Sequence, residues 1–229
     1  MDTDKTPKYH SLVKPLAQCQ LYAFLDTLYL CGRAPQKVTE QLCEGGADLI
    51  QLRAKQSSLA EIRAMAEKML PITQAAGVGL VINDHLSLAQ EIGADFCHLG
   101  QEDFFGCGYS HVSQLAKLNP HVRIGLSTHK PEQGKVALAA GPDYVAIGPV
   151  YATNTKPTAK PVTLDYVRWA AANVRIPWFA IGGISLQNLD QVLAAGAQRI
   201  CVVSAILKSD DVVGACRTFK ERVAPISNP

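Results

Sequence analysis

Residues 46–55 read GADLIQLRAK. This segment contains a short Gly-Ala-Asp joint followed by an apolar run, a pattern that the chain repeats. Its first three residues recur as GAD at 93–95, GPD at 141–143 and GAQ at 196–198, each time directly before an apolar run. Glycine favours the left-handed backbone conformation that ends a helix, and a short turn then leads into the next strand. Four copies of this joint predict a chain built from repeated β/α units.

Eight short runs rich in valine, isoleucine and leucine carry apolar side chains on consecutive positions, which is typical of buried parallel strands. The runs cover residues 21–25, 48–53, 79–83, 96–99, 123–126, 144–147, 178–181 and 199–203. Eight strands with intervening helices in 229 residues predict a single-domain (β/α)8 TIM barrel. The alternative is a doubly wound open sheet, which usually has fewer strands, and the chain lacks a GxGxxG turn after the first run.

Helical patterns lie between most of these runs. Ser58 and Glu61 predict a capping box at the start of one helix, and Ser185 is predicted to cap a later helix. Further helices are predicted at 130–140, 163–173 and 209–222. We expect residues 1–20 to form an N-terminal extension outside the barrel, residues 21–222 the barrel domain and residues 223–229 a C-terminal tail.

Composition excludes several classes of protein. Hydrophobic residues make up 48% of the chain and charged residues 18%, which is too apolar for a disordered protein. With 22 basic and 20 acidic residues, the net charge of +2 argues against a nucleic-acid-binding protein. No apolar run reaches the roughly 18–20 residues of a membrane helix, and the first residues lack the apolar centre of a signal peptide.

The seven cysteines are odd in number and include no CxxC pair. This pattern matches neither a zinc site nor a secreted disulfide framework. We expect reduced thiols in a cytoplasmic protein, most of them acting as small core residues.

Polar side chains follow the predicted strands, and in a barrel the carboxyl ends of the strands carry the chemistry. Gln51, Arg53 and Lys55 alternate along one strand, so their side chains lie on one face. One amide and two cations side by side predict a clamp for a multiply charged anion. The alternative is a solvated strand end with ordinary surface charges.

Asp84 and Asp103 follow two neighbouring predicted strands, so their carboxylates can converge. Mg²⁺ accepts one or two carboxylates and completes its shell with water and phosphate oxygens, so these residues are predicted to bind Mg²⁺. The chain offers no His/Cys set for tetrahedral zinc here. The alternative is that Asp84 caps the next helix. Glu102, beside Asp103, is expected to point elsewhere.

A monophosphate site is predicted where the seventh and eighth strands end, at Gly182-Gly183 and at Val203-Ser204. Backbone amides at such ends approach an anion closely where no Cβ intervenes. A Pro-containing loop supplies Lys156, a further cation for a diphosphate, together with hydroxyl groups; the alternative is an ordinary surface loop.

The histidines suggest no covalent chemistry. His98 lies inside a predicted strand and is expected to be a hydrogen-bonded barrel residue. His85 and His129 lie near the predicted mouth, but neither has a Ser or Cys nucleophile at a recognisable spacing. No catalytic triad is predicted.

Seven segments, in order and spread over residues 21–206, resemble those of the thiamine phosphate synthase family. They are QLRAK (51–55), IND (82–84), HLGQED (98–103), GLSTH (125–129), GPVYATNTK (148–156), AIGGI (180–184) and VVSAI (202–206). The resemblance implies a (β/α)8 barrel. It also implies an Mg²⁺-dependent transferase that joins a hydroxymethylpyrimidine diphosphate to a hydroxyethylthiazole phosphate and releases pyrophosphate.

The resemblance also implies roles for individual residues. The pyrimidine diphosphate site would comprise Gln51, Leu52, Arg53, Ala54, Lys55, Asn83, Ser127 and Lys156, and the thiazole phosphate site Thr153, Asn154, Thr155, Gly183, Val203 and Ser204. Among these, Arg53, Lys55, Ser127 and Lys156 would be catalytic, and Asp84 and Asp103 would bind Mg²⁺.

Two alternatives remain beside this interpretation. A thiazole tautomerase shares the barrel and the thiazole phosphate pocket but needs no complete diphosphate and Mg²⁺ set. A non-catalytic sensor of phosphorylated ligands would have lost one or more of the charged positions. The expected partners are small-molecule substrates, with no nucleic acid and no membrane, and a homo-oligomer is left open.

Overall fold

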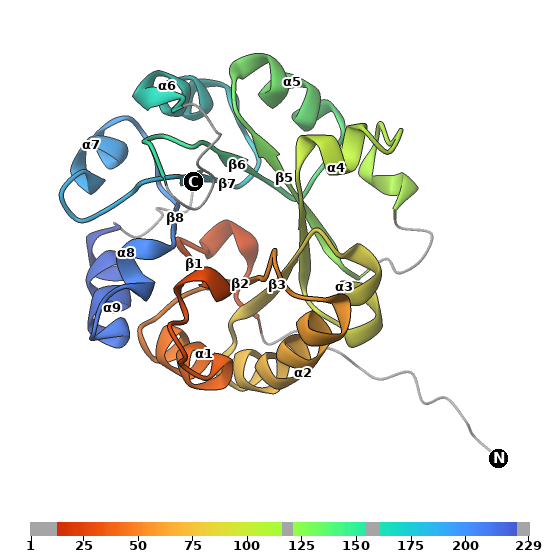
Figure 1. The fold of residues 1–229 in the computed structure, drawn as a ribbon. Helices are drawn as coiled ribbons and strands as arrows, with labels where there is room; N and C mark the ends of the chain where they lie inside the picture. Colours follow the sequence, from red (N-terminus) through yellow and green to blue (C-terminus); the bar gives the residue numbers. More distant parts are fainter. Residues whose placement is uncertain (1–12, 116–120, 154–160, 224–229) are drawn as a thin grey trace.

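In a computed structural model of the chain, which describes residues 13–115, 121–153 and 161–223, eight parallel strands close into a barrel. Each strand pairs with the next along the chain, and β8 pairs with β1 (Figure 1). The strands are β1 Leu21–Asp26, β2 Leu49–Arg53, β3 Gly79–Asn83, β4 Phe96–Leu99, β5 Arg123–Thr128, β6 Tyr144–Ile147, β7 Trp178–Ile181 and β8 Ile200–Val202. This confirms the predicted TIM barrel and excludes the open sheet.

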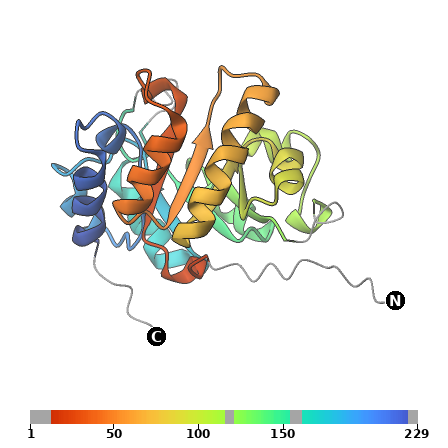
Figure 2. The same ribbon diagram turned by 90° about the horizontal axis from the view of Figure 1, so that it is seen from below.

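Helices surround the barrel on its outer face (Figure 1). They are α1 Pro35–Glu44, α2 Leu59–Ala76, α3 Leu86–Ile92, α4 Gln101–Phe105, α5 Pro131–Ala139, α6 Thr163–Asn173, α7 Leu189–Ala194, α8 Ser204–Leu207 and α9 Val212–Arg222. The described residues also form the short 3₁₀ turns η1 Leu16–Gln18, η2 Thr27–Tyr29 and η3 Val112–Gln114. Figure 2 shows α1 and α2 standing side by side along one flank.

The repeated joints have the predicted conformation. Their glycines have positive φ angles of 88° (Gly46), 73° (Gly93), 73° (Gly141) and 102° (Gly196). The aspartates of three joints have a second role. Asp48, Asp95 and Asp143 accept hydrogen bonds from backbone N–H groups just before the preceding strand or within its first two residues. Each of these three joints therefore ends one helix and also holds the start of the preceding strand.

Of the two predicted helix caps, the one at α2 is confirmed and the one at α7 is wrong. The capping box at α2 is confirmed, because the Ser58 side chain accepts from the Glu61 N–H and the Glu61 carboxylate accepts from the Ser58 N–H at 2.7 Å. Ser185 does not cap α7, which begins later with Asn188 at the N-cap position. The Asn188 side chain accepts from the Ser185 N–H at 2.9 Å, so a turn separates β7 from the helix.

The barrel interior is a small core of its own, separate from the larger core between strands and helices. Tyr22, Phe96, Tyr144 and Phe179 fill it with edge-on aromatic contacts. Gly125 makes room for one of these rings, since a Cβ at this position would lie 2.1 Å from Cζ of Tyr144. The interior is therefore packed rather than open, as expected for a barrel of this size.

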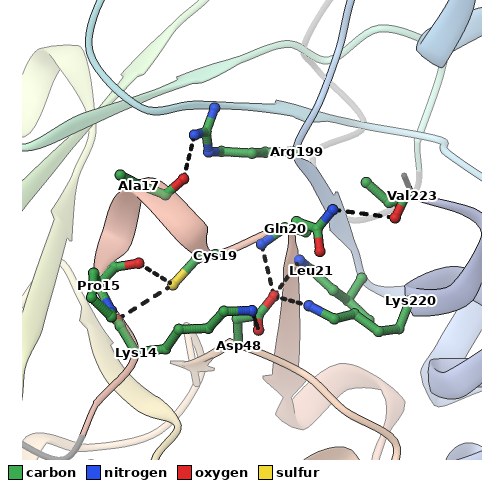
Figure 3. A network of polar contacts seen from close by, with 10 residues as sticks. All are labelled: Lys14, Pro15, Ala17, Cys19, Gln20, Leu21, Asp48, Arg199, Lys220 and Val223. Carbon is green, nitrogen blue, oxygen red and sulfur yellow. Dashed lines mark hydrogen bonds and ion pairs between the residues drawn. The ribbon is translucent and has the colours of Figure 1, made fainter. Parts of the chain in front are cut away.

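The segment before β1 closes the bottom of the barrel instead of lying outside it, which corrects the expectation for this part of residues 1–20. Leu16 and Cys19 pack into the interior core. In Figure 3, Lys14 and Lys220 both donate to the Asp48 carboxylate, Lys14 at 2.8 Å. The segment is thus bonded to the joint before β2 and, through the shared Asp48 carboxylate, linked to α9.

The seven cysteines are free: Cys19, Cys97, Cys201 and Cys216 are buried, Cys43 is half-buried, and Cys31 and Cys107 are exposed. Most of them are therefore core residues, as predicted. Within the residues that the structure describes, every helix is too short or too polar to cross a membrane.

Candidate active site at the mouth of the barrel

A cavity of about 370 Å³ opens at the carboxyl ends of the strands. All eight strands, or the residues directly after them, contribute to its wall. The predicted site residues that line it are Gln51, Arg53, Lys55, Asn83, Asp84, Asp103, Ser127, Thr153, Gly183, Val203 and Ser204. The structure therefore brings together in one space residues that the sequence separates by more than half its length.

The alternation along β2 decides which of its residues reach the cavity. Gln51, Arg53 and Lys55 line it, as the period of a strand requires. Leu52 and Ala54, which the resemblance also placed at the substrate, do not line it, because their side chains pack in the core between strands and helices. Their side chains therefore support the strand rather than the cavity wall.

Arg53 is held in place by a buried carboxylate. Its guanidinium donates to Asp26, at the end of β1, at 2.7 Å. The Asp26 side chain also accepts from the Leu28 N–H at 3.0 Å and is only 1% exposed. A guanidinium with one side fixed in this way presents its remaining N–H groups in a defined direction.

Asp84 has an unusual backbone conformation. Its φ of 66° lies in the left-handed region, which costs a non-glycine residue about 1–2 kcal/mol. It does not cap α3, because the residue at the N-cap is His85. The Asp84 carboxylate instead accepts hydrogen bonds from Asn83, at 2.6 Å, and from Lys55. Strain at a cavity wall is a common feature of functional sites.

Asp103 approaches the same cavity from α4. One of its carboxylate oxygens accepts from the Gly100 N–H at 3.2 Å, so it also closes the first turn of its own helix. Glu102 was expected to point elsewhere, but it lines the cavity as well. The reason is that α4 begins directly after β4, so its first turn lies at the cavity rim.

The wall opposite is formed by the ends of β7 and β8. Gly183 adopts a φ of 63°, and its carbonyl accepts from the Asn188 side chain at 2.9 Å. Val203, Ser204 and Thr153 complete this part of the wall. Asn154, Thr155 and Lys156 lie outside the described residues.

Sequence reasoning did not foresee one contact inside the barrel. His98 is a hydrogen-bonded barrel residue, as predicted, but its Nε2 lies 2.9 Å from Oγ of Ser127. Its Nδ1 lies 3.1 Å from the hydroxyl of Tyr144. The alternation of Phe96 and His98 along β4 is the signal that could have placed His98 inside, facing the next strand.

Cys201 also lines the cavity, but burial raises the pKa of its thiol well above the usual range. It therefore stays protonated and is a poor nucleophile.

A family model described as thiamine monophosphate synthase matches residues 21–206. The chain belongs to this family. It is 45% identical to a thiamine-phosphate synthase from Thermus thermophilus over 81% of this chain and 87% of that protein. It is 39% identical to one from Halalkalibacterium halodurans over 87% of this chain and 93% of that protein. Among solved structures, thiamine phosphate pyrophosphorylase from Pyrococcus furiosus superposes with a TM-score of 0.79 at 26% identity, covering 91% of this chain and 96% of that one.

Proposed function

We propose that the chain makes thiamine phosphate by joining the methylene carbon of a hydroxymethylpyrimidine diphosphate to the nitrogen of a hydroxyethylthiazole phosphate. Pyrophosphate leaves in the same reaction. The observation that supports this most is the mouth cavity of this family member, where two cations, two carboxylates and two amides of the predicted diphosphate side face the glycine and serine of the predicted monophosphate side.

The reaction requires stabilisation of the negative charge on the departing pyrophosphate, and Arg53 and Lys55 supply positive charge there. The C–O bond to the diphosphate breaks, and the aminopyrimidine ring stabilises the resulting cation. The thiazole nitrogen then donates its electron pair to this carbon. No side chain needs to act as a nucleophile, and the main task of the wall is to hold both substrates in line.

The donor set at Asp84 and Asp103 fits Mg²⁺. Oxygen ligands from one or two carboxylates, supplemented by water and phosphate oxygens, match its preference. The described residues contain no group of three or more His, Cys, Asp or Glu side chains placed to hold a metal ion, which argues for a metal shared with the substrate's diphosphate. When bound, Mg²⁺ would neutralise charge on the leaving pyrophosphate. Lys55, which now pairs with Asp84, would then be released towards the diphosphate.

Gly183, Val203 and Ser204 are proposed to hold the thiazole phosphate, with Thr153 and the following loop residues Asn154 and Thr155. Lys156 is proposed as a further cation for the diphosphate. A thiazole tautomerase would need only the first of these groups. Because Lys55, Asn83, Asp84 and Asp103 line the same cavity, the synthase is favoured.

We further propose that the enzyme acts in the cytoplasm on small-molecule substrates, without nucleic acid. Seven free cysteines support a reducing compartment. Light scattering of the purified protein measures whether it forms a homo-oligomer.

The direct test mixes both substrates with the purified protein, with Mg²⁺ or with a chelator, and measures pyrophosphate and thiamine phosphate. We expect both products in equal amounts, and only with Mg²⁺. Pyrophosphate formation without thiamine phosphate would contradict the coupling reaction, and full rates with the chelator would contradict the metal assignment.

A further inference from the structure

A continuous row of polar contacts crosses the interior of the barrel beneath the cavity. The Gln51 amide nitrogen donates to the hydroxyl of Tyr22 at 2.5 Å, and this hydroxyl lies 3.1 Å from that of Tyr144. The Tyr144 hydroxyl lies 3.1 Å from Nδ1 of His98, whose Nε2 lies 2.9 Å from Oγ of Ser127. We call these five residues the interior relay.

Both ends of the relay and His98 reach the cavity, and the two tyrosines do not. Gln51, His98 and Ser127 line the cavity, whereas Tyr22 and Tyr144 lie below it and are 1% and 0% exposed. Burial raises the pKa of both tyrosines well above the usual range, so each keeps its single hydroxyl proton. Both tyrosines are therefore neutral, in surroundings where an unmade hydrogen bond is costly.

Counting protons along the relay fixes its direction. A tyrosine hydroxyl that accepts from Gln51 must give its own proton to the next hydroxyl, so Tyr22 donates to Tyr144 and Tyr144 to Nδ1 of His98. A neutral His98 then carries its proton on Nε2 and donates to Ser127. The hydroxyl proton of Ser127 is thereby directed towards the cavity, while Gln51 presents its carbonyl oxygen there.

The opposite arrangement is equally well defined. If the Gln51 carboxamide turned over, its oxygen would accept from Tyr22, and every hydrogen bond along the relay would reverse. His98 would become the Nδ1–H tautomer, and Ser127 would donate to its Nε2. The cavity would then meet an N–H group at Gln51 and an acceptor oxygen at Ser127. If Gln51 and Ser127 both presented a donor to the cavity, or both an acceptor, one buried group within the relay would lack a hydrogen-bond partner.

We propose that the interior relay couples Gln51 to Ser127, so that when one presents an acceptor to the cavity the other presents a donor. His98 and Tyr144 are then positioning residues that help select the aminopyrimidine. This inference rests on the proposed function. An aminopyrimidine offers an amino group as donor and ring nitrogens as acceptors. The arrangement that this proton count assigns, an acceptor at Gln51 and a donor at Ser127, is complementary to such a ligand.

The test uses the amino pyrimidine diphosphate and its 4-oxo analogue, in which the donor becomes an acceptor. Each is bound without thiazole phosphate, so that no coupling takes place. Nitrogen-15 NMR reports the tautomer of His98, assigned by loss of its signals in His98→Asn. We expect the Nε2–H tautomer with the amino ligand and the Nδ1–H tautomer with the oxo ligand. In Tyr144→Phe, which interrupts the relay outside the cavity, the tautomer should no longer follow the ligand.

Affinity provides the second readout. Tyr144→Phe should weaken binding of the amino ligand by about tenfold and leave thiazole phosphate binding unchanged. The matched control is Tyr166→Phe, which removes a buried hydroxyl that donates to Thr128 at 2.8 Å and lies outside the relay. It should change neither the tautomer response nor the affinity. If Tyr144→Phe does not fold, Tyr22→Phe interrupts the relay one step earlier.

Two outcomes overturn the inference, and the first is the same His98 tautomer with both ligands in the wild type. A tautomer response that persists in Tyr144→Phe would also overturn it. Both results are independent of turnover. Failure of the proposed function would appear separately, as absence of thiamine phosphate when the wild-type protein receives both substrates and Mg²⁺.

Discussion

Among single residues, Asp84 combines a strained backbone with a carboxylate at the cavity wall. We predict that Asp84→Gly and Asp84→Ala both abolish Mg²⁺-dependent turnover but differ in stability. Glycine adopts a φ of 66° without penalty and alanine does not, so Asp84→Gly should be more stable than Asp84→Ala by about 1 kcal/mol. Urea unfolding and pyrophosphate release measure the two effects. Equal stability of the variants would show that the residue is not strained, and wild-type turnover in either would exclude it from the metal site.

A second residue-scale prediction concerns Asp26. It does not line the cavity, but its carboxylate orients Arg53, which does. Asp26→Asn should lower kcat/KM for the pyrimidine diphosphate by about 100-fold, because a displaced guanidinium no longer matches the leaving group. Thiazole phosphate binding, measured by calorimetry, should not change. Loss of both in equal measure would mean that the substitution disturbs the whole barrel mouth instead.

At the scale of elements, most of the fold follows from local rules. The Gly-Ala-Asp joints specify where helices end, and continuous apolar runs specify parallel strands, so all eight strands could be placed to within a few residues. The start of α7 could not, because Ser185 and Asn188 are both candidate caps, and the side chain of Asn188 at the N-cap position bonds Ser185 and Gly183 in the preceding turn. Local sequence does not distinguish between two caps three residues apart.

The capping box of α2 gives an element-scale prediction. Ser58→Ala removes the acceptor for the Glu61 N–H and should lower the free energy of unfolding by about 1 kcal/mol, with kcat unchanged. Ser57→Ala, one residue before the box, is the control and should have a smaller effect. Thermal unfolding of the two variants tests this directly. An equal loss in both would assign the effect to the loop rather than to the cap.

For the whole molecule, the network at the bottom of the barrel joins the two ends of the described chain. Burial opposes ionisation of Asp48, yet hydrogen bonds from Lys14, Lys220 and two backbone N–H groups hold its pKa below the ordinary value of 3.8. A carboxylate with a lowered pKa stabilises the fold above that ordinary value, and this contribution is lost as the pH falls through the lower, folded-state pKa.

Asp48→Asn should therefore cost about 3 kcal/mol at pH 7, because two lysines lose their partner. Between pH 7 and pH 3, the wild type should lose more of its unfolding free energy than the variant does. Asp210→Asn, at an exposed position before α9, should show the wild-type pH dependence. Parallel pH profiles for the wild type and Asp48→Asn would contradict the assignment.

The candidate site was predictable where polar residues interrupt apolar runs, as at Arg53 and Asp84. The interior relay was not, because Tyr22 and Tyr144 stand within apolar runs and read as ordinary core residues. Their hydroxyl groups matter only once the barrel closes and places β1 opposite β6. Such contacts between strands far apart in the ring leave no trace in local sequence.

Gly125 and Tyr144 share one volume inside the barrel, since a Cβ on the first would overlap the ring of the second. Neither position is then free to drift alone over evolutionary time. A lineage that acquired a larger residue at 125 would have to give up the tyrosine, and with it the link to His98. Among relatives of this chain, the residues at positions 125 and 144 should therefore vary together.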